Sequence, residues 1–373
     1  VKHSLVDLCL IEVKRGNDNE ALALWNRIKT DYPTDQVALD AYNLVERLLI
    51  ENGQLSDLPP AVSVSDDDIE QKIFRAAEDY AITGDCNNAI KKLEEYLVKY
   101  QPGYFATSAN YYLGNCYFEM NQLEKSLNAF NYVISQPVSD YSEEALVAAA
   151  TMNYNKSNFQ QALNHYIELE NVARLKNNVL EAQIGQMRCH YLLGQKDDAL
   201  IYADKVITNE NTPDPIKTTA YLWRGRIRFD RALWDEAYYD FVEVVKTGGE
   251  KAAEAKYRMC EIAYNKQAYE AAEKEIFQMI ENFSSYAEWK FKSYLLLADV
   301  YVGMDDTFQA KATLNTIIDN VSEQWVVDSA KQKLAQIDAA EAQGEEEQNR
   351  DIEINLQGEE DDNKSIEEDE DKQ

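Results

Sequence analysis

YYLGNCYFEMNQLEKSLNAF, residues 111 to 130, is the stretch that decides the fold. Gly114 lies twelve positions before a second small residue, Ser126, and the large apolar Phe130 follows four positions after that. Two helices approach closely only where their facing side chains are small, so Gly114 and Ser126 predict a crossing point between two helices. Asn121 lies between them, and asparagine is one of the residues that end a helix in the left-handed conformation. The stretch therefore predicts a helical hairpin that turns near Asn121.

The same pattern recurs along most of the chain. The second small residue of each hairpin recurs at intervals of 68, 37, 36, 37, 38, 35 and 38 residues, at Ala21, Ala89, Ser126, Ala162, Ala199, Ala237, Ala272 and Ala310. A large apolar residue follows four positions later in every case except Ala199, whose partner is Ala203. Turn sequences lie between the small residues at 14–17, 83–85, 120–121, 156–158, 193–195 and 303–305. Self-similarity at a fixed period is the signature of a repeat architecture.

The composition agrees with stacked helices. The 373 residues include only 13 glycines and 7 prolines, too few turn-forming residues for a large sheet. We therefore expect an all-α fold, a right-handed α-solenoid of about eight helical hairpins.

Breaks in the repeat pattern predict the domain boundaries. Residues 1–55 hold one hairpin and a degenerate repeat with an amphipathic segment over 36–51, and residues 56–68, which include Leu58-Pro59-Pro60, read as a linker. The hairpin array is expected over 69–342, where an amphipathic helix over 322–340 caps its end. Residues 343–373 are expected to form a disordered acidic tail, because residues 341–373 hold 15 acidic residues against three basic ones.

The hairpins resemble the tetratricopeptide repeat family. The stretch over 111–130 matches best, and YLWRGRIRFDRALWDEAYYDF (221–241) and LLLADVYVGMDDTFQAKATL (295–314) follow closely. The resemblance covers about residues 1 to 335. It departs from the commonest form of the family because tryptophan is missing at repeat position 4 and the period is longer than the usual 34 residues.

This longer period is similar to that of repeat proteins in bacterial envelopes, including the Tol-Pal coordinator and outer-membrane assembly lipoproteins, and to large repeat proteins of Bacteroidetes. The resemblance implies a scaffold or adaptor that binds proteins or peptides, envelope proteins among them. It also implies a periplasmic or outer-membrane-associated location, with a cytoplasmic one as the alternative. Leu5, Leu8 and Leu10 lack a cap, so we expect them to contact earlier repeats of a longer parent chain.

The register of the first helices predicts a concave groove that binds polypeptide. Repeat position 12 is aromatic in five successive repeats, and position 9 places two arginines near the middle of the groove. Aromatic rings and arginine are enriched in protein recognition surfaces, so an extended peptide or helix with an acidic group near its middle would fit. The predicted groove residues are Asn115, Phe118, Thr151, Tyr154, Arg188, Tyr191, Arg226, Phe229, Glu261 and Tyr264.

Other interpretations of these residues remain open. The rings can pack against neighbouring helices, as aromatic residues at helical spacing usually do, and both arginines can pair with nearby carboxylates. The chain can also be a structural spacer within a longer repeat protein. A glycan- or peptidoglycan-binding module would use aromatic rings as well, since sugar faces stack on them.

Several functional classes lack support in the sequence. The formal net charge of −30 argues against nucleic acid as a partner. No apolar stretch is long enough to cross a membrane. The three histidines have no ligand spacing and no phosphate-binding glycine motif occurs, so we expect no enzyme activity, no cofactor and no metal. The five cysteines form no CxxC pair and indicate no disulfide framework.

Overall fold

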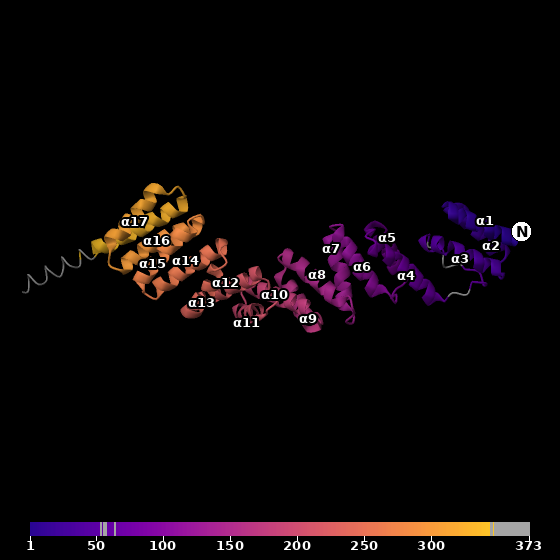
Figure 1. Cartoon of the computed structure of the whole chain (residues 1–373), viewed down its shortest axis with the longest axis horizontal. Coiled ribbons are helices and arrows are strands. Elements are labelled where there is room, and N and C mark those ends of the chain that lie inside the picture. Colours follow the sequence, from indigo (N-terminus) through magenta and orange to yellow (C-terminus); the bar gives the residue numbers. More distant parts are fainter. Residues whose placement is uncertain (53, 55–57, 63–64, 344–345, 347–373) are drawn as a thin grey trace, which may run out of the picture. The chain divides into compact units, whose positions relative to one another are not determined.

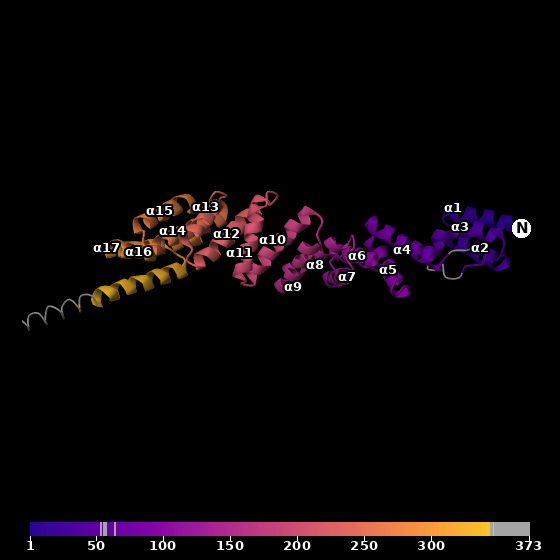
Figure 2. The same ribbon diagram turned by 90° about the horizontal axis from the view of Figure 1, so that it is seen from below.

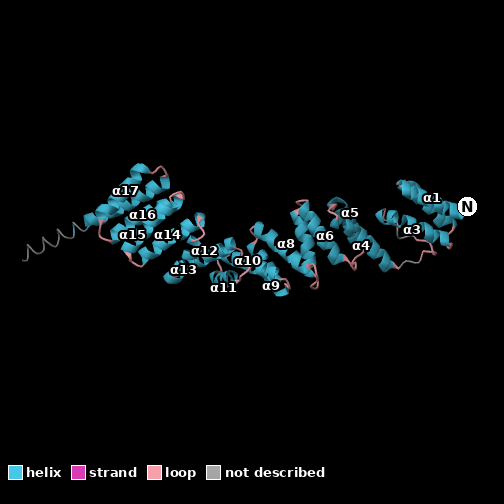
Figure 3. Ribbon diagram, viewed as in Figure 1, coloured by secondary structure: helices cyan, strands magenta, loops and turns pink. Residues whose placement is uncertain are grey.

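The computed structural model describes all residues except 53, 55–57, 63–64, 344–345 and 347–373. Within these described residues the chain is entirely helical, with no strand, which confirms the predicted all-α class (Figure 3). The chain divides into two compact units, residues 1–195 (unit 1) and 196–373 (unit 2), which are described separately below.

Helices of two kinds alternate along the chain (Figure 1). The first helices of the repeats, here called A helices, are α1 (Lys2–Arg15), α4 (Asp66–Ile82), α6 (Ala106–Glu119), α8 (Ser142–Asn155), α10 (Lys176–Leu192), α12 (Asp214–Asp230), α14 (Gly249–Asn265) and α16 (Ala287–Gly303). The second helices, here called B helices, are α2 (Asp18–Asp31), α5 (Cys86–Lys99), α7 (Leu123–Ser135), α9 (Phe159–Val172), α11 (Lys196–Thr208), α13 (Trp234–Val245), α15 (Tyr269–Phe283) and α17 (Thr307–Asn320).

Within each unit, the helices pack mainly against their neighbours in sequence, as in an α-solenoid. In unit 1, α4 also contacts α6 and α8 contacts α10, and in unit 2, α12 contacts α14 and α14 contacts α16. The A helices of each of these pairs therefore lie side by side (Figure 2).

All eight A helices end in the same way. In each case, a residue one or two positions past the last helical residue adopts a positive φ. These residues are Gly16, Gly84, Asn121, Ser157, Gly194, Ala232, Gln267 and Asp305. The next backbone N–H donates to a carbonyl five residues back, as from Gln122 to Tyr117 and from Leu233 to Arg228. This is the Schellman arrangement, which satisfies carbonyls that the helix end leaves free.

The predicted crossing points are confirmed. The Ser126 Oγ donates to the Gly114 carbonyl at 2.7 Å, and a Cβ at Gly114 would lie 2.7 Å from the ring of Phe130. In unit 2, a Cβ at Gly225 would lie 2.7 Å from the ring of Phe241. Small residues are thus required where the helices of one hairpin cross.

The core of unit 1 begins with three helices, α1, α2 and the additional helix α3 (Gln36–Glu51). The predicted amphipathic segment over 36–51 coincides with α3. Described residues of the predicted linker pack on this core, since Val62 is buried and the Ala61 N–H donates to the Pro33 carbonyl. The helix α4 begins inside the predicted linker, at Asp66.

A last helix follows α17 over residues 324–343. Its residues Val326 and Ala330 are buried against Leu314 and Ile317 of α17, and Lys333 pairs with Asp299 of α16. The predicted cap over 322–340 therefore covers the end of the array. Of the predicted acidic tail, only residues 343 and 346 lie within the described residues.

Candidate functional site

The A helices of unit 1 present an exposed surface made of polar and apolar residues, here called the unit 1 A-helix face. Its predicted residues Asn115 and Thr151 are exposed, and the ring of Phe118 is 53% exposed. Ile82 at the end of α4 is 66% exposed and Leu192 at the end of α10 is 43% exposed. The face thus keeps large apolar side chains in contact with solvent. Ile82 and Leu192 are not among the predicted groove residues.

Arg188 lies on the same face, on α10, and is half-buried. Among the residues that the structure describes, no carboxylate forms an ion pair with its guanidinium. A half-buried guanidinium has already lost part of its hydration, so a carboxylate that reaches it gains a charge-assisted, two-pronged hydrogen bond.

The A helices of unit 2 differ because their charges are paired within the unit. Arg226 donates to both carboxylate oxygens of Glu254, at 2.6 and 2.5 Å, and Glu254 is buried. Arg258 donates to Glu261 at 2.8 Å. Arg226 is therefore paired locally with a carboxylate, which was the alternative interpretation of this residue, and is not a free cation.

Three of the predicted groove rings pack against the first residue of the following B helix. The ring centroids are 5.6 Å apart for Tyr154 and Phe159, 5.2 Å apart for Phe229 and Trp234, and 6.0 Å apart for Tyr264 and Tyr269. Each pair spans five residues across the A–B turn. These rings stabilise their own hairpins, whereas Phe118 has Leu123 at the corresponding position and stays exposed.

Two predicted residues of unit 2, Glu261 and Tyr264, lie together in a cleft of about 320 Å³ between α14, α16 and the last helix. Lys333 donates to both carboxylate oxygens of Asp299 at its wall, at 2.6 and 2.7 Å. Because the charges of Lys333 and Asp299 already satisfy each other, the side chains of the cleft that remain for a ligand include Tyr257, Tyr264 and Leu295.

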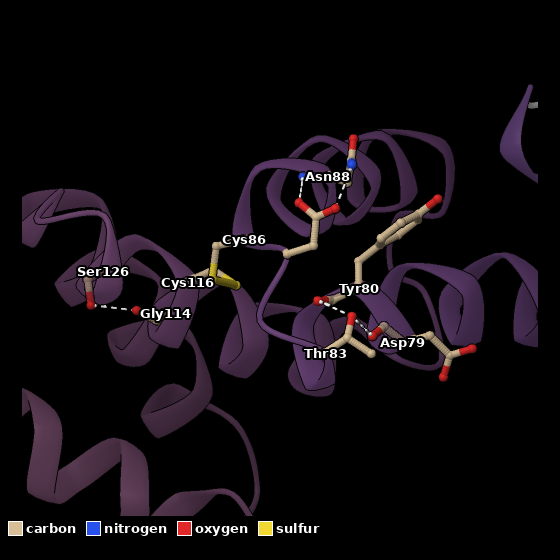
Figure 4. The surroundings of a disulfide bond; sticks show 9 residues. Asp79, Tyr80, Thr83, Cys86, Asn88, Gly114, Cys116 and Ser126 are labelled. Atoms are coloured by element: carbon tan, nitrogen blue, oxygen red, sulfur yellow. Dashed lines mark hydrogen bonds between the residues drawn. A yellow bond between two sulfur atoms is a disulfide. The ribbon is translucent and has the colours of Figure 1, made fainter.

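A disulfide joins Cys86, the first residue of α5, to Cys116 in α6, which corrects the expectation of no disulfide (Figure 4). The Cα atoms are 5.0 Å apart although 30 residues separate the two cysteines in sequence. Only packing of one hairpin on the next brings them together, so spacing in the sequence gave no signal.

The other three cysteines, Cys9, Cys189 and Cys260, are free and buried, as expected of small core residues. Burial raises the pKa of Cys9 to about 11 and that of Cys189 to about 12. These thiols are therefore protonated and unreactive at neutral pH.

The histidines and acidic residues form no metal-binding arrangement in the described part of the chain. His190 is buried on α10 and its Nδ1 lies 2.6 Å from the Gln195 Oε1, while His165 lies on α9. None of the helices described is both long and apolar enough to cross a membrane.

Solved structures to which the chain is similar include repeat proteins. No curated protein matches the chain. A solved tetratricopeptide repeat protein from Parabacteroides merdae is 15% identical to the chain, with a TM-score of 0.37. The match covers 70% of this chain and 97% of the Parabacteroides merdae chain. The C-terminal part of a TPR repeat-containing protein from Cytophaga hutchinsonii is 15% identical, with 69% and 98% coverage and a TM-score of 0.48.

A third solved structure, the TPR2AB domain of yeast Sti1 in complex with pHSP90, is 12% identical, with 72% and 96% coverage and a TM-score of 0.33. The family model described as tetratricopeptide repeat matches residues 108–137, which include most of α6 and all of α7, and residues 292–323, which include most of α16 and all of α17. The family model thus matches one segment in each of the two units.

Proposed function

We propose that this protein is a protein–protein interaction scaffold whose main binding surface is the unit 1 A-helix face. Tetratricopeptide repeats are present, and a solenoid offers a ligand a long surface of side-by-side helices rather than an enclosed pocket. The observation that carries the proposal is the exposed ring of Phe118 on the same face as Arg188, whose guanidinium has no carboxylate partner among the described residues.

The chemistry of this face defines the ligand. An exposed ring and the apolar ends of α4 and α10 favour large apolar side chains, because burying them removes apolar surface from water. Arg188 favours a carboxylate, and Asn115 and Thr151 offer hydrogen bonds to a peptide backbone. We therefore propose a polypeptide ligand with apolar residues on both sides of an acidic one.

We further propose that the scaffold works in a bacterial cell envelope, in the periplasm or at the outer membrane. The disulfide between Cys86 and Cys116 supports this location, because disulfides persist in oxidising compartments and are rare in the cytosol. The long repeat period supports it only through the resemblance described above.

A structural spacer is the second candidate, and the internally paired charges of unit 2 favour it for that part of the chain. Arg226, Glu254 and Glu261 already have partners, so this surface gains little from a foreign ligand. In that case unit 2 holds its neighbours in place while unit 1 binds.

In-cell photo-crosslinking tests the proposal. A photoreactive residue replaces Phe118 or Arg188, and the control replaces Ile167, an exposed apolar residue on the B helix α9. We expect the same envelope polypeptides to be captured from both A-helix positions and not from Ile167. Equal capture from Ile167, or capture of glycan alone, would overturn the proposal.

A further inference from the structure

Among the described residues, one repeat of unit 1 has no second helix. The helix α3 is followed by α4 with no B helix between them, since none of the described residues within 52–65 is helical. Every other A helix of unit 1 that follows a hairpin packs against the B helix before it. The face of α4 that such a helix would cover is therefore left without its usual partner.

The comparison with α8 shows what is missing. On α8, Ala145, Ala149 and Met152 pack with Phe130 and Val133 of the preceding B helix α7 and are 0%, 0% and 5% exposed. The corresponding residues of α4 lie at the same offsets from the crossing-point alanine, at Lys72, Ala76 and Asp79. Lys72 and Ala76 are only partly buried, and Asp79 is exposed.

A cleft occupies the place of the missing helix. It measures about 580 Å³ and lies between α3 and α4, where Ile50, Ala76 and Tyr80 form its apolar part. A smaller cavity of about 70 Å³ shares these three residues and extends the cleft to Tyr96 of α5. The cleft therefore lies along α3 and α4, just as α5 and α7 lie against the helices before and after them.

The charges along the cleft are arranged for a complementary partner. Arg47 and Lys72 are paired with Glu51 and Glu46, two carboxylates of α3. Arg75 and Asp79, one turn apart on α4, line the cleft and form no ion pair with any described residue. A helix that carries an acidic and a basic residue one turn apart would satisfy both.

We propose that this cleft, the α3–α4 cleft, binds an amphipathic helix of a second polypeptide in the place of the missing B helix. The B helices of this chain show the required pattern, since Phe130, Val133 and Ile134 of α7 pack on Ala145 and Ala149 of α8. The ligand helix therefore carries large apolar residues at positions i, i+3 and i+4, with charged residues facing Arg75 and Asp79. This site is separate from the unit 1 A-helix face and does not depend on the function proposed for it.

A labelled peptide of residues 121–137, which contains α7, serves as the probe. Its binding to the full chain is measured by fluorescence anisotropy. Ala76→Trp fills the cleft, Arg75→Glu reverses its free cation, and Phe118→Ser alters only the A-helix face. We expect saturable binding that Ala76→Trp weakens at least about tenfold, that Arg75→Glu weakens less, and that Phe118→Ser leaves unchanged. Absence of saturable binding, or equal binding to Ala76→Trp, would overturn the proposal.

Thermal unfolding of the free chain tests whether the cleft is open. Ala76→Trp should leave the unfolding temperature nearly unchanged, because the ring enters empty space. The matched variant Ala149→Trp should lower it strongly, because α7 already covers that position. If both variants are destabilised alike, residues of this chain fill the cleft and no foreign helix has room to bind.

Discussion

Gly114→Ala should destabilise the protein, although alanine is the better helix former. The new Cβ would lie 2.7, 2.8 and 2.9 Å from three ring carbons of Phe130, whereas carbons in contact prefer about 3.5–4.0 Å. The ring must therefore retreat by about 1 Å, yet Phe130 is only 1% exposed and packs against Val133 and Ala149. Overpacking of this kind costs about 1–3 kcal/mol, and the helix propensity of alanine returns about 1 kcal/mol. We expect a net loss of about 1 kcal/mol.

Urea unfolding followed by far-UV circular dichroism measures this loss, and Phe130→Leu provides the matched second site. The smaller leucine leaves room for the new methyl group, so the double variant should be more stable than the sum of the single effects by about 1–2 kcal/mol. A gain in stability for Gly114→Ala alone would refute the crossing-point argument. So would additivity of the two substitutions within about 0.5 kcal/mol.

Three further predictions concern the turns, the junction of α3 and α4, and the disulfide. Ala232→Gly should raise the unfolding free energy by about 0.5–1 kcal/mol in urea titrations. A positive φ costs alanine about 1–2 kcal/mol, whereas glycine loses about 0.5–1 kcal/mol in chain entropy. A lower unfolding free energy for Ala232→Gly would contradict this prediction. Burial acts to raise the pKa of Glu46, but hydrogen bonds from Lys72 and Tyr42 hold it below its ordinary value of 4.5. This carboxylate therefore stabilises the fold above pH 4.5 and less as the pH falls through its lowered pKa, so the stability difference between wild type and Glu46→Gln should shrink below pH 4.5; a constant difference would contradict this. Reduction with dithiothreitol should cost up to about 3–4 kcal/mol, the loop-closure value for the 30-residue separation of Cys86 and Cys116, and should leave Cys86→Ser unaffected.

Much of the fold could be predicted from the sequence because the same hairpin geometry recurs in eight repeats. Gly114, Ser126 and Phe130 already define a hairpin, and the recurrence of their spacing located the others. Turns without glycine or asparagine escaped this reasoning. Ala232 and Gln267 adopt a positive φ only because the packed helices on both sides impose it, and their side chains give no local signal.

The candidate site could be predicted less fully, because a register assigns a residue to a face and not to a partner. Arg188 and Arg226 occupy the same repeat position, yet Arg226 pairs with Glu254 of α14, whereas no carboxylate among the described residues forms an ion pair with Arg188. In the same way Tyr154 meets an aromatic residue across its turn and Phe118 does not. These differences depend on the neighbouring repeat, which the pattern of a single repeat does not contain.

The central claim is that the unit 1 A-helix face binds polypeptide, and the affinity of a captured partner tests it most directly. Isothermal titration calorimetry would compare the wild-type chain with the double variant Phe118→Ser/Arg188→Ala and with Ile167→Ser, the control on the B helix α9. We expect the double variant to bind at least about thirtyfold more weakly, as truncation of a buried ring or arginine in an interface costs about 2 kcal/mol or more, and Ile167→Ser to bind normally. Equal affinity for all three proteins, or a loss confined to Ile167→Ser, would contradict the claim.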